Sequence, residues 1–262
     1  MSFKLLFAIP FLSIATVSTG VHAQASDDLA QQLANPIAAI ISVPFQLNYD
    51  DNMGPNNKGN RKTFNLQPVI PFSMENGANI VTRTIIPYIW EKDVVPGKSR
   101  EGVADVLFSA WYSKTTESGV TWGVGPTVRI PTNSDVSTET WAAGATGIAL
   151  KVVGPWTYGG LAYHLWDLES NPTVPTSTTG LQPFLSYTTD TKWTYSLTSE
   201  SSYNWETEQW SVPINISASK LAPIGKTLIN WQAGVGYWAN SPTFGPEGIR
   251  YRVQAQIVIP KK

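Results

Sequence analysis

The feature that most constrains the fold of this chain is a regular alternation of apolar and polar residues. The alternation is clearest over residues 120–130, where every even-numbered position is apolar and every odd-numbered one is Gly, Thr or Arg. Successive side chains of a β-strand point to opposite faces, so this segment is predicted to be a strand with one apolar and one small or polar face. The same pattern returns in residues 192–198, 210–217 and 249–259.

About twelve such segments follow one another to the end of the chain, and each is close to the roughly 9–11 residues that a tilted membrane strand needs. The approximate ranges are 40–49, 61–72, 78–90, 102–113, 119–130, 142–153, 156–166, 179–188, 192–200, 209–219, 227–239 and 248–259. We therefore predict an all-β fold, a transmembrane antiparallel β-barrel of about twelve strands with a short N-terminal periplasmic helix. An even number of strands would place both chain ends on the periplasmic side.

The N-terminus has the pattern of an export signal. Lys4 gives a short positive start, residues 5–17 are almost continuously apolar, and small residues precede Gln24. This is typical of a secretory signal peptide, because the apolar run is too short for a spanning helix; an uncleaved anchor or a buried helix is the alternative. We expect a signal peptide over 1–23, an N-terminal periplasmic segment over 24–36 whose helix is capped by Ser26, and a barrel over 37–262.

Composition excludes several classes of function. The chain has no Cys, so it can form neither a disulfide framework nor a thiolate metal site, and its net charge of −1 does not suggest a nucleic-acid partner. Charged residues make up only 14% of the chain, against about 25% in soluble domains. One histidine and scattered carboxylates do not make a metal site, so no cofactor is expected. An exported protein of this kind is either a membrane barrel or a secreted β-sandwich.

Loop lengths and aromatic residues favour the membrane barrel. The connections after odd-numbered predicted strands are long and polar, whereas those after even-numbered ones are mostly short, with residues 219–226 the longest of that set. Long outer loops and short periplasmic turns are typical of outer-membrane barrels, as are aromatic girdles at both interfaces. The predicted outer girdle is Tyr49, Phe64, Tyr88, Trp90, Trp141, Trp166, Trp210, Tyr237, Trp238 and Tyr251, and the periplasmic girdle is Phe72, Trp111, Tyr112, Trp122, Trp156, Tyr187 and Trp193.

Prolines inside the predicted strands count against regular pairing. Each proline removes one hydrogen-bond donor from the sheet, so some should mark bulges or strand ends, and the sequence does not fix the register of individual strands. The prolines concerned are Pro44, Pro68, Pro71, Pro87, Pro126, Pro183 and Pro213.

Several segments resemble the family named for the MetA pathway of phenol degradation, whose members are often mislabelled bacterial "neuromedin U". The matching segments are NPIAAIISVPFQ (35–46), NLQPVIPF (65–72), TRTIIPYIW (82–90), GVADVLFSAW (102–111), WGVGPTVRIPT (122–132) and GVGYW (234–238). The resemblance implies an outer-membrane barrel with a transport role, suggests hydrophobic or aromatic solutes, and carries over no catalytic residue. The chain departs from many outer-membrane proteins in ending on Pro260-Lys261-Lys262 rather than on an aromatic residue.

Inward-facing polar residues are the candidate functional set. Strand phases predict a cluster of Arg83, Asp105 and Arg129 in the outer half of the lumen. These charges either pair and brace the lumen or form a constriction that selects polar or anionic solutes. The inward surplus is positive, which predicts a weak preference for anions. The other inward candidates are Lys151, His164, Arg250 and Arg252.

The predicted function is that of a monomeric channel or transporter in the outer membrane of a Gram-negative bacterium. It would pass small solutes through a narrow polar lumen, since a barrel of this size is near the limit at which side chains fill the interior. The expected partners are outer-membrane lipid, a small-molecule solute and the barrel-assembly machinery. A structural or surface-interaction barrel with a closed lumen is the first alternative. A lipid-modifying enzyme is the second, and it is not expected because His164 is predicted to face inward.

Overall fold

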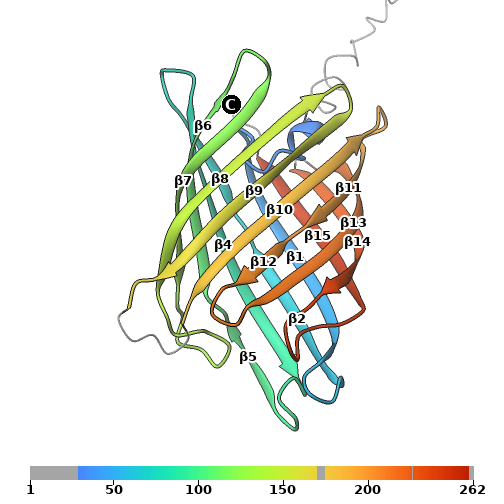
Figure 1. The fold of residues 1–262 in the computed structure, drawn as a ribbon. Coiled ribbons are helices and arrows are strands. Elements are labelled where there is room, and N and C mark those ends of the chain that lie inside the picture. Colours follow the sequence, from blue (N-terminus) through green and yellow to red (C-terminus); the bar gives the residue numbers. More distant parts are fainter. Residues whose placement is uncertain (1–28, 170–174, 226, 260–262) are drawn as a thin grey trace, which may run out of the picture.

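The computed structural model describes residues 29–169, 175–225 and 227–259 and contains one antiparallel sheet (Figure 1). The predicted signal peptide and the predicted cap at Ser26 lie outside these residues. Strand β1 pairs with β2 on one side and with β15 on the other, so the sheet closes into a barrel. The strands are β1 (Ile41–Met53), β2 (Gly59–Leu66), β3 (Val69–Ser73), β4 (Asn79–Lys92), β5 (Ser99–Val103), β6 (Val106–Thr115), β7 (Val120–Ile130), β8 (Ala142–Val153), β9 (Trp156–Asp167), β10 (Ser177–Thr188), β11 (Trp193–Ser199), β12 (Ser201–Asn204), β13 (Gln209–Ile224), β14 (Thr227–Asn240) and β15 (Ile249–Ile259).

Three of the twelve barrel strands are interrupted, and each interruption faces a proline. The pairs β2/β3, β5/β6 and β11/β12 are each one barrel strand with a short break. The first break faces Pro44, the second faces Pro87, and Ser199 at the third donates its hydroxyl to the carbonyl of Pro213. Proline cannot donate to the ladder, so pairing lapses at these points. At residues 104–105 the register also shifts by one residue, which is a β-bulge.

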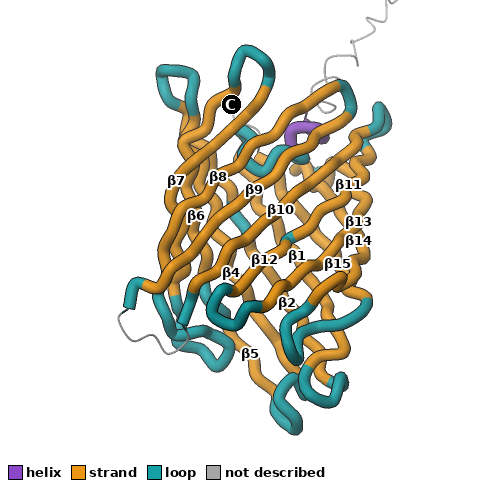
Figure 2. Tube along the Cα trace, viewed as in Figure 1, coloured by secondary structure: helices purple, strands orange, loops and turns teal. Residues whose placement is uncertain are grey.

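The two ends of the barrel differ in their connections (Figure 2). At the turn end, where Ile41 pairs with Ile259, the strands are joined by two to five residues. At the opposite loop end they are joined by four to eleven. The predicted asymmetry is therefore present, although β13 extends through residues 219–224, which had been predicted as part of a connection. Within the described residues no helix is long and apolar enough to cross a bilayer.

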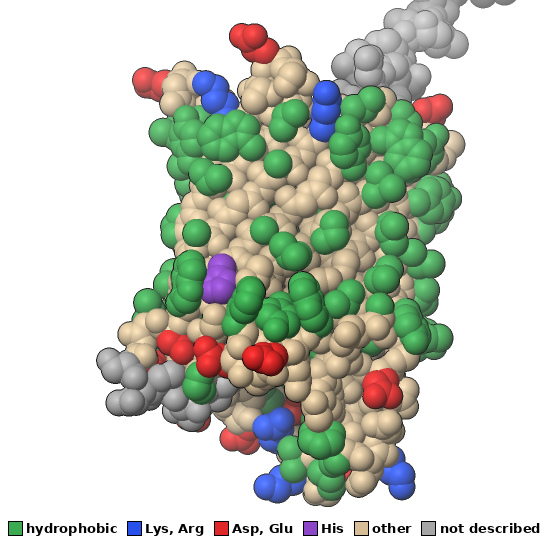
Figure 3. All heavy atoms as spheres, in the orientation of Figure 1, with side chains coloured by type: hydrophobic (Ala, Val, Ile, Leu, Met, Phe, Trp, Pro, Cys, Tyr) green, Lys and Arg blue, Asp and Glu red, His purple; other side chains and the backbone are tan. Residues whose placement is uncertain are grey.

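On the face shown in Figure 3, apolar side chains form two bands, with charged side chains beyond both. Exposed aromatic side chains occur near both ends of the strands, as in the pairs Trp156–Tyr187 and Tyr88–Trp90, whose ring centroids are 4.8 and 4.5 Å apart. Two residues predicted for the girdles are instead inside: Trp111 is 1% exposed, and Trp238 donates its indole N–H to Asp50 over 2.8 Å. Both indole rings therefore lie in the lumen and not on the outer face.

The first described residues fold into the turn end of the barrel, and we call residues 29–40 the N-terminal plug. Residues 29–32 form one helical turn. Ile37 is 4% exposed and packs in a cluster that includes the inward-facing Val81, Trp111 and Ile148. Ala30 and Ile40 pack in a second cluster against the barrel wall. The plug therefore closes much of the lumen at this end, and residues 37–40, which had been predicted to begin the barrel, belong to it.

Candidate functional site in the barrel lumen

The lumen has two chemically different walls. One wall, from β3, β4, β6, β8, β9 and β10, is apolar and packs against the plug. The apolar wall differs from the predicted lumen, which was entirely polar because the more polar face of each strand was expected to point inward. The apolar wall consists of Val69, Val81, Trp111, Ile148, Leu150, Leu161, Tyr163 and Phe184.

The opposite wall carries a network of carboxamides on β1, β2, β14 and β15. Gln46 accepts hydrogen bonds from Asn48 and Asn65 and donates one to Gln254 over 3.1 Å. Asn230 donates to the carbonyl oxygen of Gln256. Buried polar groups need such partners, and here neighbouring strands supply them. The lumen is thus amphipathic across its width.

Glu200 is the centre of a charged cluster and lies at the break between β11 and β12. Its carboxylate accepts two hydrogen bonds from Arg252, of 2.9 and 2.7 Å, and lies 3.7 Å from Arg250. Arg250 also pairs with Asp50 at 3.1 Å, and its guanidinium is 4.9 Å from the ring of Trp238. Charges inside a barrel are costly unless paired, and each charge of this cluster has an ionic partner.

The sequence analysis identified both arginines of this cluster and missed both of its carboxylates. The strand alternation did contain the signal for Glu200. It continues the inward row of Thr194, Ser196 and Thr198 on β11. Asp50 follows Gln46 and Asn48 in the same way, but it had been placed in a loop.

The predicted cluster of Arg83, Asp105 and Arg129 is present only in part. Arg129 lies 3.6 Å from Asp105. Arg83 instead pairs in register with Ser109, about four residues, or roughly 13 Å, along the strand from Asp105. Its guanidinium lies 5.4 Å from the ring of Trp111, and it forms no ion pair with another residue of the described ranges.

Asp105 also fastens the loop between β7 and β8. Its carboxylate accepts hydrogen bonds from the hydroxyls of Ser137 and Thr138 and from the backbone N–H of Thr138, the last at 3.1 Å. The bulge at residues 104–105 turns Asp105 toward this loop. Asp105 is therefore a loop anchor as well as the partner of Arg129.

We expect Asp105→Ala to release the loop over residues 131–141. The substitution removes the acceptor of three loop hydrogen bonds, and hydrogen bonds to a charged group contribute about 1.5–3 kcal/mol each. Limited proteolysis of the folded protein should then cut within this loop much faster than in the unaltered chain. Glu139→Ala is the matched control, because Glu139 is an exposed carboxylate of the same loop. Equal cleavage of both variants would show that Asp105 does not hold the loop.

Lys151 and His164, both predicted to face inward, face outward. Lys151 is paired with Val120 and Tyr158, which are on the outer face. His164 is paired with Thr179, and its Nδ1 lies 2.7 Å from the Thr179 hydroxyl oxygen. The prediction was wrong because β8 and β9 direct their larger apolar side chains into the lumen, so the polar residues between them point to the lipid.

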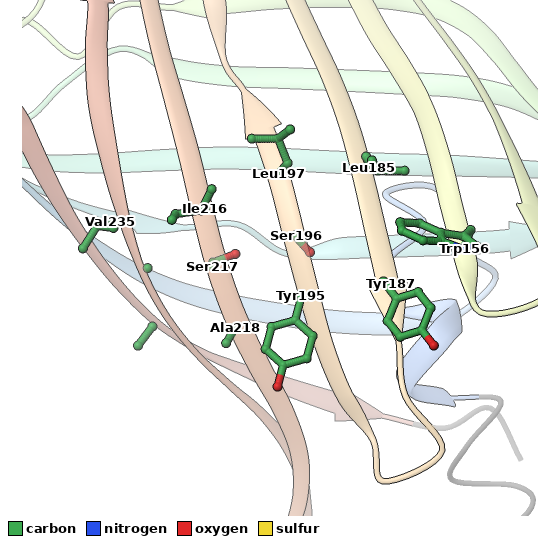
Figure 4. Close-up of a pocket in the computed structure, with 12 residues that line it drawn as sticks. Trp156, Leu185, Tyr187, Tyr195, Ser196, Leu197, Ile216, Ser217, Ala218 and Val235 are labelled. Carbon is green, nitrogen blue, oxygen red and sulfur yellow. The ribbon is translucent and has the colours of Figure 1, made fainter.

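A hollow of about 690 Å³ lies on the outer face of the barrel, across β9, β10, β11, β13 and β14 (Figure 4). Trp156, Tyr187 and Tyr195 contribute aromatic rings to its lining, and Ala218 and Ala233 contribute small side chains. An apolar hollow on the lipid-facing side is suited to acyl chains and is separate from the lumen.

No protein-family model and no curated protein matches this chain. Solved structures do. An outer-membrane channel from Pseudomonas putida F1 is similar with a TM-score of 0.66 and 14% sequence identity, over 84% of this chain and 94% of that one. The KdgM porin, solved in complex with disordered oligogalacturonate, gives 0.51 and 13% over 84% and 99%. Outer membrane phospholipase A from Escherichia coli gives 0.50 and 11% over 90% and 98%.

These likenesses and the two apolar bands define the class of fold. It is that of the outer-membrane β-barrels, closed by twelve antiparallel strands. The similar structures of this class include channels and an enzyme, so the fold alone does not define the function of this chain.

Proposed function

We propose that this protein is an outer-membrane channel for small amphipathic solutes, with a narrow lumen that the N-terminal plug restricts at the turn end. The observation that carries the proposal is the two-walled lumen. A solute with an apolar body and a polar group could contact the apolar wall around Trp111 and Tyr163 while it hydrogen-bonds to the carboxamides opposite. Aromatic solutes, which the resemblance to the phenol-degradation family suggests, fit this description.

We also propose in which membrane the barrel lies and which of its ends faces the outside of the cell. The barrel would lie in the outer membrane as a monomer, inserted by the barrel-assembly machinery, with its loop end toward the outside of the cell. Long outer loops and short periplasmic turns support this orientation. The plug would then face the periplasm, where a segment following an export signal emerges.

The charges of the lumen support a weak preference for anions. Among the described residues, six arginines and five carboxylates face the interior, and all the carboxylates except Asp167 are in ion pairs with arginines. The arginines are Arg61, Arg83, Arg100, Arg129, Arg250 and Arg252, and the carboxylates are Asp50, Glu91, Asp105, Asp167 and Glu200. Arg83 is the arginine without such a partner among the described residues. Rings of fixed charge set the selectivity of narrow pores.

A closed structural barrel is the second candidate, because Ile37 is almost fully buried in the lumen. Liposome swelling separates the two functions. We expect liposomes containing the refolded full-length mature protein to swell faster than protein-free liposomes in solutions of phenylalanine, a zwitterion with an aromatic body that scarcely crosses lipid without a channel. Planar bilayers should give a small reversal potential of anion-selective sign. Absence of swelling in both the unaltered chain and a variant without the plug would favour the structural role.

A lipid-modifying enzyme is not the function that this geometry favours. His164 is on the lipid-facing surface, but Thr179 Oγ1 also accepts the indole N–H of Trp205 over 2.9 Å, and the buried Nε2 of His164 has no hydrogen-bond partner among the described residues. A hydroxyl nucleophile needs a histidine that a further group orients. Release of fatty acid from the same liposomes, abolished by His164→Ala, would support the enzyme instead.

A further inference from the structure

A chamber lies between the N-terminal plug and the barrel wall. Its volume is about 240 Å³. Pro36 and Ile40 of the plug line one side, and Val69 of β3 adds an apolar surface from the wall. Ligand pockets for drug-sized molecules range from about 300 to 1,000 Å³. The chamber is therefore of a size for a smaller molecule, and the plug makes part of its wall.

Arg83 lines this chamber and supplies its positive charge. The guanidinium rests over the ring of Trp111 at 5.4 Å, and no carboxylate of the described residues is within ion-pair distance. Glu200, which also carries a negative charge inside the barrel, is already paired with Arg250 and Arg252. A guanidinium has five N–H donors in a planar fork that matches a carboxylate.

The glutamines around Arg83 present donors rather than acceptors. Gln254 and Gln256 both line the chamber. The carbonyl oxygen of Gln254 accepts a hydrogen bond from Gln46, and that of Gln256 accepts one from Asn230. Their amide N–H groups make no hydrogen bond to another described residue. A carboxylate accepts hydrogen bonds only, so these donors complement it.

We propose that the chamber binds a small carboxylate with an apolar body, such as a short-chain or aromatic monocarboxylate. Arg83 pairs with the carboxylate, the N–H groups of Gln254 and Gln256 complete its hydrogen bonds, and Val69 and Ile40 contact the apolar body. This inference rests on the proposed channel function and deepens it, since such a molecule is the solute that the channel would pass.

Benzoate and benzamide are the probes that test the charge requirement, because they differ only in the carboxylate. Isothermal titration of the refolded mature protein in detergent should show saturable binding of benzoate and at least about tenfold weaker binding of benzamide. Arg83→Gln should weaken benzoate binding by about the same factor, while Arg83→Lys keeps part of it. Arg61→Gln is the matched control and should leave it unchanged, because Glu91 retains Arg100 as its partner.

Three results would overturn the proposal: no binding of benzoate, equal binding of benzoate and benzamide, or full affinity in Arg83→Gln. Heat-modifiability on gels shows whether each variant is folded. If Arg83→Gln does not fold, Gln256→Leu should still lower benzoate affinity several-fold, and unchanged affinity there would count equally against the site. Liposome swelling of the same preparations reports the channel separately, so loss of the carboxylate site and loss of the channel function are distinguishable.

Discussion

Removal of residues 29–39 is expected to raise the conductance of the channel several-fold in planar bilayers. The plug fills the turn end of the lumen with Ile37, which packs against Trp111 and Val81. Without it, the gap between the apolar wall and the carboxamide wall becomes open to water over the full height of the barrel. Liposome swelling should become faster for the same reason.

A single substitution tests the same contact without changing the chain length. Ile37→Ala should weaken docking of the plug by about 2–5 kcal/mol, the usual cost of removing a buried Ile side chain. Openings of the channel should therefore become more frequent. Ile216→Ala is the matched control, because Ile216 is 57% exposed on the outer face. A conductance that stays the same after both the deletion and Ile37→Ala would show that the barrel is blocked elsewhere.

Glu200→Gln is expected to lower the stability of the barrel and to increase its anion selectivity. Breaking a buried ion pair costs about 3–5 kcal/mol because the remaining charge is left without a partner. The side chain of Glu200 is 38% exposed, so we expect about 2 kcal/mol, measured by urea unfolding in lipid vesicles. The surplus of positive charge in the lumen also rises by one, which should shift the reversal potential toward that of an anion channel.

The control for this prediction is a carboxylate of the same barrel that does not face the lumen. Glu101 on β5 is exposed on the outer face, across from Trp90. Glu101→Gln should leave both the unfolding midpoint and the reversal potential within experimental error. If Glu200→Gln lowers stability but leaves selectivity unchanged, the cluster braces the barrel and does not line the conducting path.

The strand pattern predicted most of the fold because membrane and lumen impose opposite requirements on alternate residues. In β7 and β15 one face must be apolar and the other can be small or polar, so the phase is unambiguous. The number of barrel strands and their approximate ranges followed from this pattern. The positions of the breaks did not, although the prolines that cause them were visible in the sequence.

The lumen was predicted less well than the fold, and β8 shows why. Ile148 and Leu150 face the lumen because they pack against the plug, whereas the outer face of β8 carries small alanines and Lys151. The alternation is present in β8, but the more apolar face points into the lumen and the face with small and polar residues points outward. Nothing in the sequence of this strand alone indicates that orientation. Only the plug, which comes from a distant part of the chain, explains it.

The pairing of Arg83 could not be predicted for a second reason. Assigning Asp105 as its neighbour required the register between β4 and β6, and the observed register places Ser109, four residues away, opposite Arg83. The bulge at residues 104–105 accounts for only one of these four residues. The pair of Asp105 and Arg129 was correct because Arg129 is opposite Leu107, only two residues from Asp105.

The three strand breaks lie beside polar side chains with distinct roles: Gln67 lines the chamber, Asp105 anchors a loop, and Glu200 holds two arginines. A break frees backbone groups, and in a bilayer such groups must be satisfied from inside the barrel. Each break is thus accompanied by a polar side chain that faces the interior or a loop. A substitution at one of these prolines is therefore expected to change the interior of the barrel as well as its wall.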